Sequence, residues 1–539
     1  MELLGKIYII NICTLRNTTR RFTGTAKCME HGKMNFVKNL FGRKIEFSNK
    51  DIFCIAITAI YALITLVLVA HHEPFEDEVN VWMILHNLKG FAMWKHIFDD
   101  GNPPGFFMLL LPFVKSGLSY LSVKMICWLS CVLSVFLLNR FSPFPVFLNV
   151  IITFSAPMLY AYPVIARCYS LLPLLIILAA MLYPSVSDSD TANKGNHNEI
   201  CAVLYLLVLA AIAQNHVIMF AFAGLMFALF AYQRFYKAGE RRLPVIAAAF
   251  AVFIALAAIV FQSVLVLKTH IGYKIPNPVN LTSLKNVILP FFSCFFDMAS
   301  CTMFSGGIDN IKFIFKISVT VSIFVVLLIL YCLYKKNKTF FFICLAGIIF
   351  PLYIYITRRS VVFPNRVFIV HLFFIFFFWI IIKNSKILAE KSYGKILIAS
   401  LSFLFLLSVP SGIAMSFSDF NGNFSSAMDI ADFIKVNIPD DGKSIIVSPG
   451  SWQGVPVAYY LYPRPVFALN GKQIKHIEAH SSTLENHLAE SGITKGKNYI
   501  YIVASKYQRE NLASSGYTFI YETTPAIIME EDYVLYRIP

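Results

Sequence analysis

Three consecutive acids, Glu76, Asp77 and Glu78, follow directly after the apolar stretch 51–70. A carboxylate near a membrane surface can act as a general base, because partial burial raises its pKa, and it can also bind a divalent cation. Negative charge at a helix start is stabilising by about 0.3–1 kcal/mol, which is the purely structural explanation. That explanation suffices for Glu76, whereas Asp77 and Glu78 are candidate site residues.

The loop that contains these acids, 71–104, is rich in groups that bind cations or move protons. It carries six acids, four histidines and only two lysines. Asp100 belongs to a second acidic pair, just before the next apolar stretch. Together, Asp77, Glu78 and Asp100 offer oxygen ligands that suit Mg or Mn. Three histidines of the loop would instead favour Zn: His71, His72 and His96.

Two helix signals lie within this loop. In residues 77–88 the apolar side chains recur at near-helical spacing, which predicts a short amphipathic helix lying on the membrane surface. Pro103 and Pro104 suit the start of the following helix, since proline lacks an N–H that would have no partner there.

The composition of the whole chain is that of a polytopic α-helical membrane protein. Of its 539 residues 57% are hydrophobic and 14% charged, whereas soluble domains carry about 25% charged residues. The apolar runs are continuous, so the alternation of a β-barrel is excluded. Twelve stretches are candidate spans: 51–70, 105–121, 124–138, 143–160, 169–183, 200–213, 216–232, 243–267, 313–334, 339–356, 367–382 and 396–415.

The net charge of +16 is unevenly placed. Residues 417–539 carry 10 Lys/Arg and 13 Asp/Glu, a net charge of −3, so the remainder carries +19. Short basic segments without interleaved aromatics indicate the positive-inside rule and exclude nucleic-acid binding. They place 71–104 and everything after 416 outside, in what we take to be a bacterial inner membrane. The two halves agree only if one segment within 105–160 is short, re-entrant or miscounted, so we expect 11 or 13 spans.

The chain divides into three parts: a basic cytosolic extension (1–50), a transmembrane domain (51–416) and an extracytoplasmic domain (417–539). The last part has short β-rich runs at 444–450, 498–505, 517–523 and 533–539 and helical patterns at 425–438 and 483–493, which predict a small α/β domain. Its stretch 448–465 holds a Trp and three Tyr that either stack on a sugar or, as we favour, fill the core of the sheet.

Eleven cysteines are scattered without the spacing of a metal site. Cys294 and Cys301 share one external loop and can form a disulfide, although free buried thiols are the simpler interpretation. No cofactor is indicated beyond the divalent cation considered above.

Four motifs in order resemble the GT-C superfamily of membrane glycosyltransferases, which includes the protein O-mannosyltransferases and aminoarabinose transferases. The first is "DEVNVWMILHNL" followed by "DDGNPPGFFMLLL", in which Asn102 stands where many members have His. The others are "VIARCYSLLPLL", "AQNHVIMFAFAGL" and "RRSVVFPNRVFIVHLFFIFFF". The resemblance extends from about residue 51 to 382 and implies a GT-C fold.

The resemblance implies transfer of a sugar from a polyprenyl-phosphate donor to an acceptor at the outer face, with inversion. Asp77 is then the catalytic base, and Glu78 orients it or binds a metal. Cationic side chains at outer span ends would stabilise the phosphate that leaves, although snorkelling to lipid headgroups explains them too. The candidate donor-phosphate ligands are Arg167, Arg358, Arg359, Arg366, His216 and Tyr169. A route without metal is preferred to one with Mg, Mn or Zn.

Two other functions stay open. A polymerase or ligase of surface polysaccharide would rely on external Arg and His and have less need of an Asp-Glu pair. A transporter or flippase would place paired charges near the bilayer midplane, whereas the charges here cluster at span ends. The sequence leaves the sugar and the acceptor (lipid, glycan or protein) open.

Overall fold

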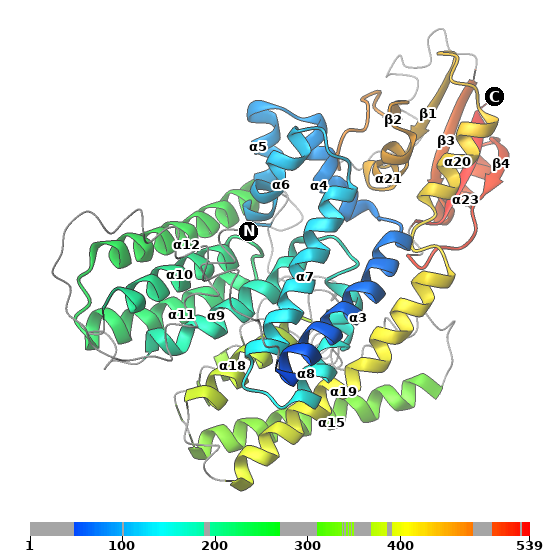
Figure 1. Cartoon of the computed structure of the whole chain (residues 1–539). Coiled ribbons are helices and arrows are strands. Elements are labelled where there is room, and N and C mark those ends of the chain that lie inside the picture. The colour runs from blue at the N-terminus through cyan, green and yellow to red at the C-terminus, as the bar shows by residue number, and fades with distance from the viewer. Residues whose placement is uncertain are drawn as a thin grey trace, which may run out of the picture.

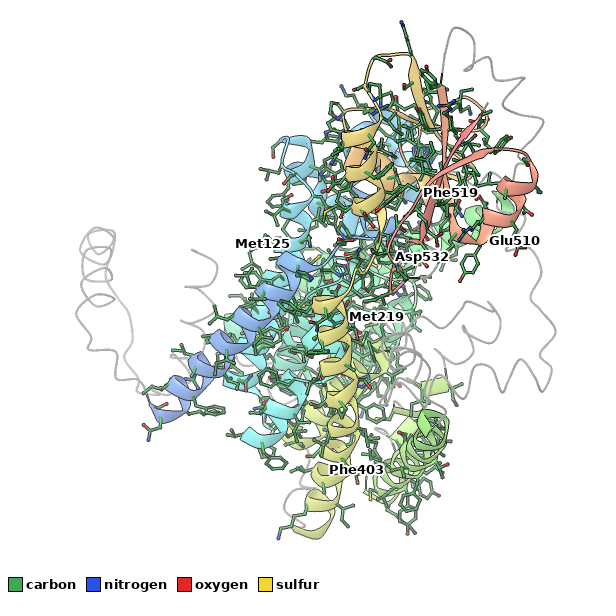
Figure 2. The ribbon with its side chains drawn as sticks, turned by 90° about the vertical axis from the view of Figure 1, so that its right-hand side faces the viewer. Met125, Met219, Phe403, Glu510, Phe519 and Asp532 are labelled. Atoms are coloured by element: carbon green, nitrogen blue, oxygen red, sulfur yellow. The ribbon has the colours of Figure 1, made fainter. Side chains whose placement is uncertain are left out.

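A computed structural model of the chain has two parts, a large helical part and a C-terminal domain built on a sheet (Figure 1). It describes residues 48–99, 102–187, 195–269, 310–336, 368–384, 391–477, 499–528 and 531–538, with a few residues between 338 and 349. In Figure 2 the C-terminal domain, marked by Glu510 and Phe519, lies at one end, and Phe403 of the last long helix lies toward the other. The predicted combination of a helical membrane part with a small α/β domain is confirmed.

The helical part contains the elements that carry the predicted site. In chain order these are α3 (Asn49–His71), α4 (Glu76–Asn87), α5 (Gly90–Asp99), α6 (Gly105–Lys115), α7 (Leu121–Phe141), α8 (Val146–Thr153), a π-helical turn η2 (Pro157–Ala161), a 3-10 turn η3 (Cys168–Leu171), α9 (Leu172–Ser187), α10 (Gly195–Ala213), α11 (Met219–Ala231), a second π-helical turn η5 (Tyr232–Lys237), α12 (Leu243–Thr269), α15 (Asn310–Lys336), α18 (Ile369–Asn384) and α19 (Lys391–Asn421).

Five helical stretches of the described residues are long and apolar enough to cross a membrane: Asn49–His71, Leu121–Phe141, Met219–Lys237, Leu243–Val264 and Gly394–Asn421. Five shorter apolar helices accompany them. Helix α3 shows the pattern, since Leu63 and Val67 on its outer face are 66% and 54% exposed while Tyr61 is fully buried. A face of exposed large apolar side chains is stable in lipid and not in water.

One short segment was expected within residues 105–160, and two helices there are short, since α6 has 11 residues and α8 is shorter still. Helix α8 has only eight residues, or about 12 Å at 1.5 Å per residue, against a hydrocarbon core of about 30 Å. Proline explains the interruption, because Pro145 precedes α8 and Pro157 opens the turn η2. The total of 11 or 13 spans stays a prediction, as do the disulfide between Cys294 and Cys301 and the helix at 483–493, which lie outside the described residues.

The C-terminal domain holds a five-stranded sheet in the order β2-β1-β3-β5-β4, in which β1 is parallel to β2 and β3 and β5 is antiparallel to β3 and β4. The elements are α20 (Ala427–Asn437), β1 (Ser444–Ser448), α21 (Ser451–Leu461), β2 (Val466–Ala468), β3 (Tyr499–Ser505), a 3-10 turn η8 (Lys506–Gln508), α23 (Arg509–Ser514), β4 (Thr518–Glu522) and β5 (Tyr533–Ile538). All four β-rich runs of the sequence are strands, and the helix predicted at 425–438 is α20.

Residues alternate between the two faces of this sheet, as the period of two requires. Ile446, Val503 and Leu535 belong to the large core that continues into the helical part. Ile502 and Val534 belong to a second, smaller core, which Leu512 of α23 completes.

Two predicted features differ from the structure. The stretch 448–465 contributes to the core of the domain through Val455 and Val457 of the helix α21, which are fully buried. The prediction that its Trp and Tyr side chains fill the core is wrong for Trp452 and Tyr462, which are 50% and 57% exposed because they lie at the two ends of α21. Helix α4 forms as predicted, but its predicted place on the membrane surface is wrong, because residues 78–85 are all buried. The reason is that α4 packs against α6 and against α21 of the C-terminal domain, so its outer side is covered by protein.

Candidate active site

The three acids of the opening motif form the first turn of α4. The N–H groups of a first helical turn have no partner within the helix. Here two acidic side chains accept hydrogen bonds at the start of α4. Glu78 accepts from the N–H of Phe75, the residue before the helix (3.3 Å), and Glu531 accepts from the N–H of Glu76, its first residue (2.7 Å). Glu531 comes from the C-terminal domain, so both parts of the chain fix this helix start.

Asp77 lies against Arg167, which comes from a motif 90 residues further along the chain. The guanidinium Nη2 is 3.1 Å from Asp77 Oδ2, and Nη1 donates to the Asp77 carbonyl oxygen. The Arg167 side chain is 8% exposed and that of Asp77 is 33% exposed. The pair therefore presents a reachable carboxylate on a guanidinium that is held inside the protein.

Glu78 points the other way and is completely buried. Its oxygens accept from the Tyr120 hydroxyl (3.1 Å), the Ala166 N–H (2.6 Å) and the His72 ring (2.9 Å). Burial alone would raise the pKa of Glu78, but the positive charge of His72 and these hydrogen bonds hold it below its usual value. Glu78 is thus enclosed by hydrogen-bond partners from three other segments of the chain.

His72 lies between two acids, a role that its sequence position alone did not indicate. Its Nε2 is 2.9 Å from Glu78 Oε2, and its Nδ1 is 2.9 Å from Oδ2 of Asp419, near the end of α19. Burial alone would lower the pKa of His72, but Asp419 and Glu78 outweigh it and raise the pKa to about 9. Tyr160 donates to Asp419 (3.0 Å), and the Lys124 ammonium donates to the His72 carbonyl oxygen (2.8 Å). Acids and histidines at span ends were the sequence signal for this cluster.

The second and third family-like motifs also meet in the structure. The rings of Tyr169 and His216 are 4.7 Å apart, and both residues are buried. His216 Nδ1 accepts from the Ile218 N–H (3.2 Å), so the proton of a neutral ring lies on Nε2. Nearby, the Gly105 N–H donates to the Gln214 carbonyl oxygen (3.0 Å), which ties the start of α6 to the end of α10.

Four of the predicted site residues lie outside the described part of the chain: Asp100, Arg358, Arg359 and Arg366. Their roles stay predictions.

The described residues hold no group of three or more His, Cys, Asp or Glu side chains arranged to bind a metal ion. A cation on Glu78 would have to displace the His72 ring or the Ala166 N–H from its oxygens. His72 as a zinc ligand is equally disfavoured, because both ring nitrogens face carboxylates. Glu78 and His72 therefore do not fit a metal ion as they stand. A divalent cation on Asp77 and Asp100 stays a prediction, because Asp100 lies outside the described residues.

An apolar groove of about 560 Å³ runs between α3, η2 and α19. Its lining is Ile64, Val67, Leu68, Phe154, Leu159, Ile413, Ser416, Phe417 and Phe420. Phe420 follows Asp419 in the chain, and its ring lies 5.0 Å from that of His71. One end of the groove is therefore close to the His72 cluster.

Comparisons with known proteins give a similarity of fold only. No protein-family model and no curated protein sequence matches the chain. The structure of ArnT from Cupriavidus metallidurans bound to undecaprenyl phosphate is 10% identical, with a TM-score of 0.49 over 90% of this chain and 98% of that one. ArnT in the apo state is 11% identical, with a TM-score of 0.44 over 91% and 98%.

Proposed function

We propose that this chain is a membrane glycosyltransferase of the GT-C type, which moves a sugar from a polyprenyl-phosphate donor to an acceptor. The observation that carries the proposal is the pairing of Asp77 with Arg167. A partly exposed carboxylate is suited to take a proton, and a buried guanidinium is suited to hold a phosphate.

In the proposed reaction Asp77 accepts the proton of the acceptor hydroxyl or amine. The freed electron pair attacks the anomeric carbon of the sugar from the side opposite the phosphate. The bond between that carbon and the phosphate oxygen breaks, and polyprenyl phosphate leaves with the electron pair. The configuration of the sugar is thereby inverted, and Arg167 stabilises the charge that develops on the phosphate.

Arg167 has two tasks in this scheme because its guanidinium already contacts Asp77. A donor phosphate that binds Arg167 competes with the carboxylate for the same N–H groups. Donor binding therefore releases Asp77 toward the acceptor, which orders the two substrates. Tyr169, two residues after Arg167, and His216 beside it would contact the sugar or the phosphate. Further positive charge for the phosphate would come from Arg358, Arg359 and Arg366.

Two further features support a lipid-linked substrate at the outer face. The apolar groove between α3 and α19 offers an environment for a hydrocarbon chain next to the polar site. The basic segments of the sequence orient the loop 71–104 and the C-terminal domain outward, across a bacterial inner membrane.

The test is a transfer assay with the full chain in nanodiscs. The protein is incubated with radiolabelled polyprenyl-phosphate sugars and a membrane extract as acceptor, once with a chelator and once with added Mg, Mn or Zn. We expect label in the acceptor fraction in the presence of the chelator. No transfer from any of the donors under any of these conditions would overturn the proposal.

A further inference from the structure

The His72 ring joins three elements of the fold. It follows α3 directly, contacts Glu78 in the first turn of α4, and contacts Asp419 near the end of α19. The side chains of His72 and Glu78 are 0% exposed and that of Asp419 is 2% exposed. The junction is therefore inside the protein and does not reach substrate.

The hydrogen bonds of the ring define its protonation. A neutral imidazole has one N–H donor and one acceptor nitrogen. Each ring nitrogen here faces a carboxylate oxygen at 2.9 Å, so two donors are needed and the ring is an imidazolium. The Lys124 ammonium on the His72 carbonyl oxygen adds a second positive charge beside Glu78 and Asp419, and Glu73 is a third acid close to His72. Removing one partner from a buried cluster of opposite charges is costly.

Glu78 transmits this constraint to the site. It accepts from the N–H of Ala166, and its neighbour Asp77 pairs with Arg167, the residue after Ala166. Two consecutive residues of α4 are thus bridged to two consecutive residues before η3. The bridge through Glu78 is buried and the bridge through Asp77 is partly exposed, so the first fixes the spacing of the second.

We propose that His72 is a positioning residue. It ties Glu78 of α4 to Asp419 of α19 and thereby sets the geometry of the Asp77–Arg167 pair. The inference rests on the proposed function for its effect on transfer, but the geometry it claims can be measured without any transfer. It also links the last membrane helix, which leads into the C-terminal domain, to the reaction centre.

The variant His72→Gln tests the proposal. A glutamine amide donates from one end only, so its carbonyl oxygen would face one of the two carboxylates. A misplacement of about 1 Å can cost about 100-fold in rate, and we expect kcat to fall by about 10-fold to 100-fold. Adding Asp419→Asn gives that carbonyl a donor and keeps the charge balance, so the double variant should recover most of the loss. His86→Gln is the control, because this histidine at the other end of α4 bonds to the Asn87 side chain instead of a carboxylate, and it should retain wild-type kcat.

A second measurement reads the pair itself and needs no activity. In an Asp77→Cys background, the introduced thiol lies next to Arg167, which favours the thiolate. The pH dependence of its alkylation, followed by mass spectrometry of the peptide around position 77, gives its pKa. We expect this pKa to rise toward the ordinary value of about 8.5 when His72→Gln is added, and to return with Asp419→Asn.

Each outcome decides a separate point. An unchanged thiol pKa in the presence of His72→Gln would overturn the positioning role, as would a double variant no more active than the single one. The thiol pKa could also shift and recover while the chain with Asp77 intact transfers no sugar. That result would support the positioning role and reject the proposed function.

Discussion

Asp77 and Arg167 were each predicted as site residues, but their pairing was not. They lie 90 residues apart in the chain, and no pattern within either motif reports the distance between them. Glu78 was predicted either to orient Asp77 or to bind a metal. The structure favours the first role, because the Glu78 oxygens already accept from Tyr120, Ala166 and His72. Residue type and order along the chain identify candidates, and packing decides which of them face substrate.

Arg167→Lys should lower kcat/KM for the lipid-linked donor by about 10-fold to 100-fold, since a hydrogen bond to a charged group is worth about 1.5–3 kcal/mol. An ammonium is a single point charge and lacks the forked N–H groups with which Arg167 holds Asp77 and exchanges its carboxylate for a phosphate. Initial rates at varied donor concentration measure the effect. Arg140→Lys is the control and should keep the wild-type kcat/KM. Arg140, in the last turn of α7, also pairs with an aspartate, Asp51 (2.7 Å). Equal kcat/KM in both variants would remove Arg167 from the site.

At the scale of elements, helices and strands were predicted where periodicity or β-propensity was strong. The four strands and α20 follow from local residue choice. The charge of the loops indicated an irregular segment within 105–160 but did not identify α8. The burial of α4 could not be predicted, because its outer face is covered by α21, which lies more than 350 residues later in the chain. Its apolar spacing is equally compatible with a lipid surface.

Gly105→Ala tests whether the contact between α6 and α10 positions the site. A Cβ on Gly105 would lie 2.4 Å from the Gln214 carbonyl oxygen, so the backbone of one helix must move. Overpacking of this kind costs about 1–3 kcal/mol, and we expect a lower unfolding temperature and a loss of transfer. Gly224→Ala is the matched control in α11, where a Cβ meets nothing within 4 Å. An unfolding temperature equal to wild type for Gly105→Ala would contradict the close approach of the two helices.

At the scale of the molecule, the C-terminal domain is part of the site's support. Asn80 Oδ1 of α4 accepts from the Ile477 N–H (2.8 Å), and Glu531 accepts from the Glu76 N–H. These partners are separated by 397 and 455 residues, so the sequence could predict the domain but not its docking on α4. The docking explains why α19 and α4 share one buried cluster.

Glu531 should make the stability of the chain depend on pH. Burial raises its pKa to about 8, to which the negative charges of Glu78 and Asp77 also contribute. An unfolded glutamate has a pKa of about 4.3, so between these values the folded state binds a proton that the unfolded state lacks. Stability is therefore highest below about pH 4.3 for this group and is lost as the pH rises toward 8.

Glu531→Gln removes this proton and keeps an oxygen that can accept from the Glu76 N–H. Its unfolding temperature should fall less than that of wild type between pH 5 and pH 8, as measured by scanning fluorimetry in detergent. Glu510→Gln is the control, since Glu510 is exposed at the edge of the C-terminal domain (Figure 2). If the unfolding temperature falls with pH as steeply in Glu531→Gln as in wild type, the buried acid is ionised over the whole range from pH 5 to pH 8.

The central claim, that Asp77 is the base of a sugar transfer, is tested most directly by comparing Asp77→Asn with Glu76→Gln in the nanodisc transfer assay. Both changes remove one negative charge from the first turn of α4, but only the first removes the carboxylate beside Arg167. A general base contributes about 100-fold to 10,000-fold, so we predict a loss of that size for Asp77→Asn and wild-type transfer within about threefold for Glu76→Gln. Equal transfer by the two variants would contradict the account.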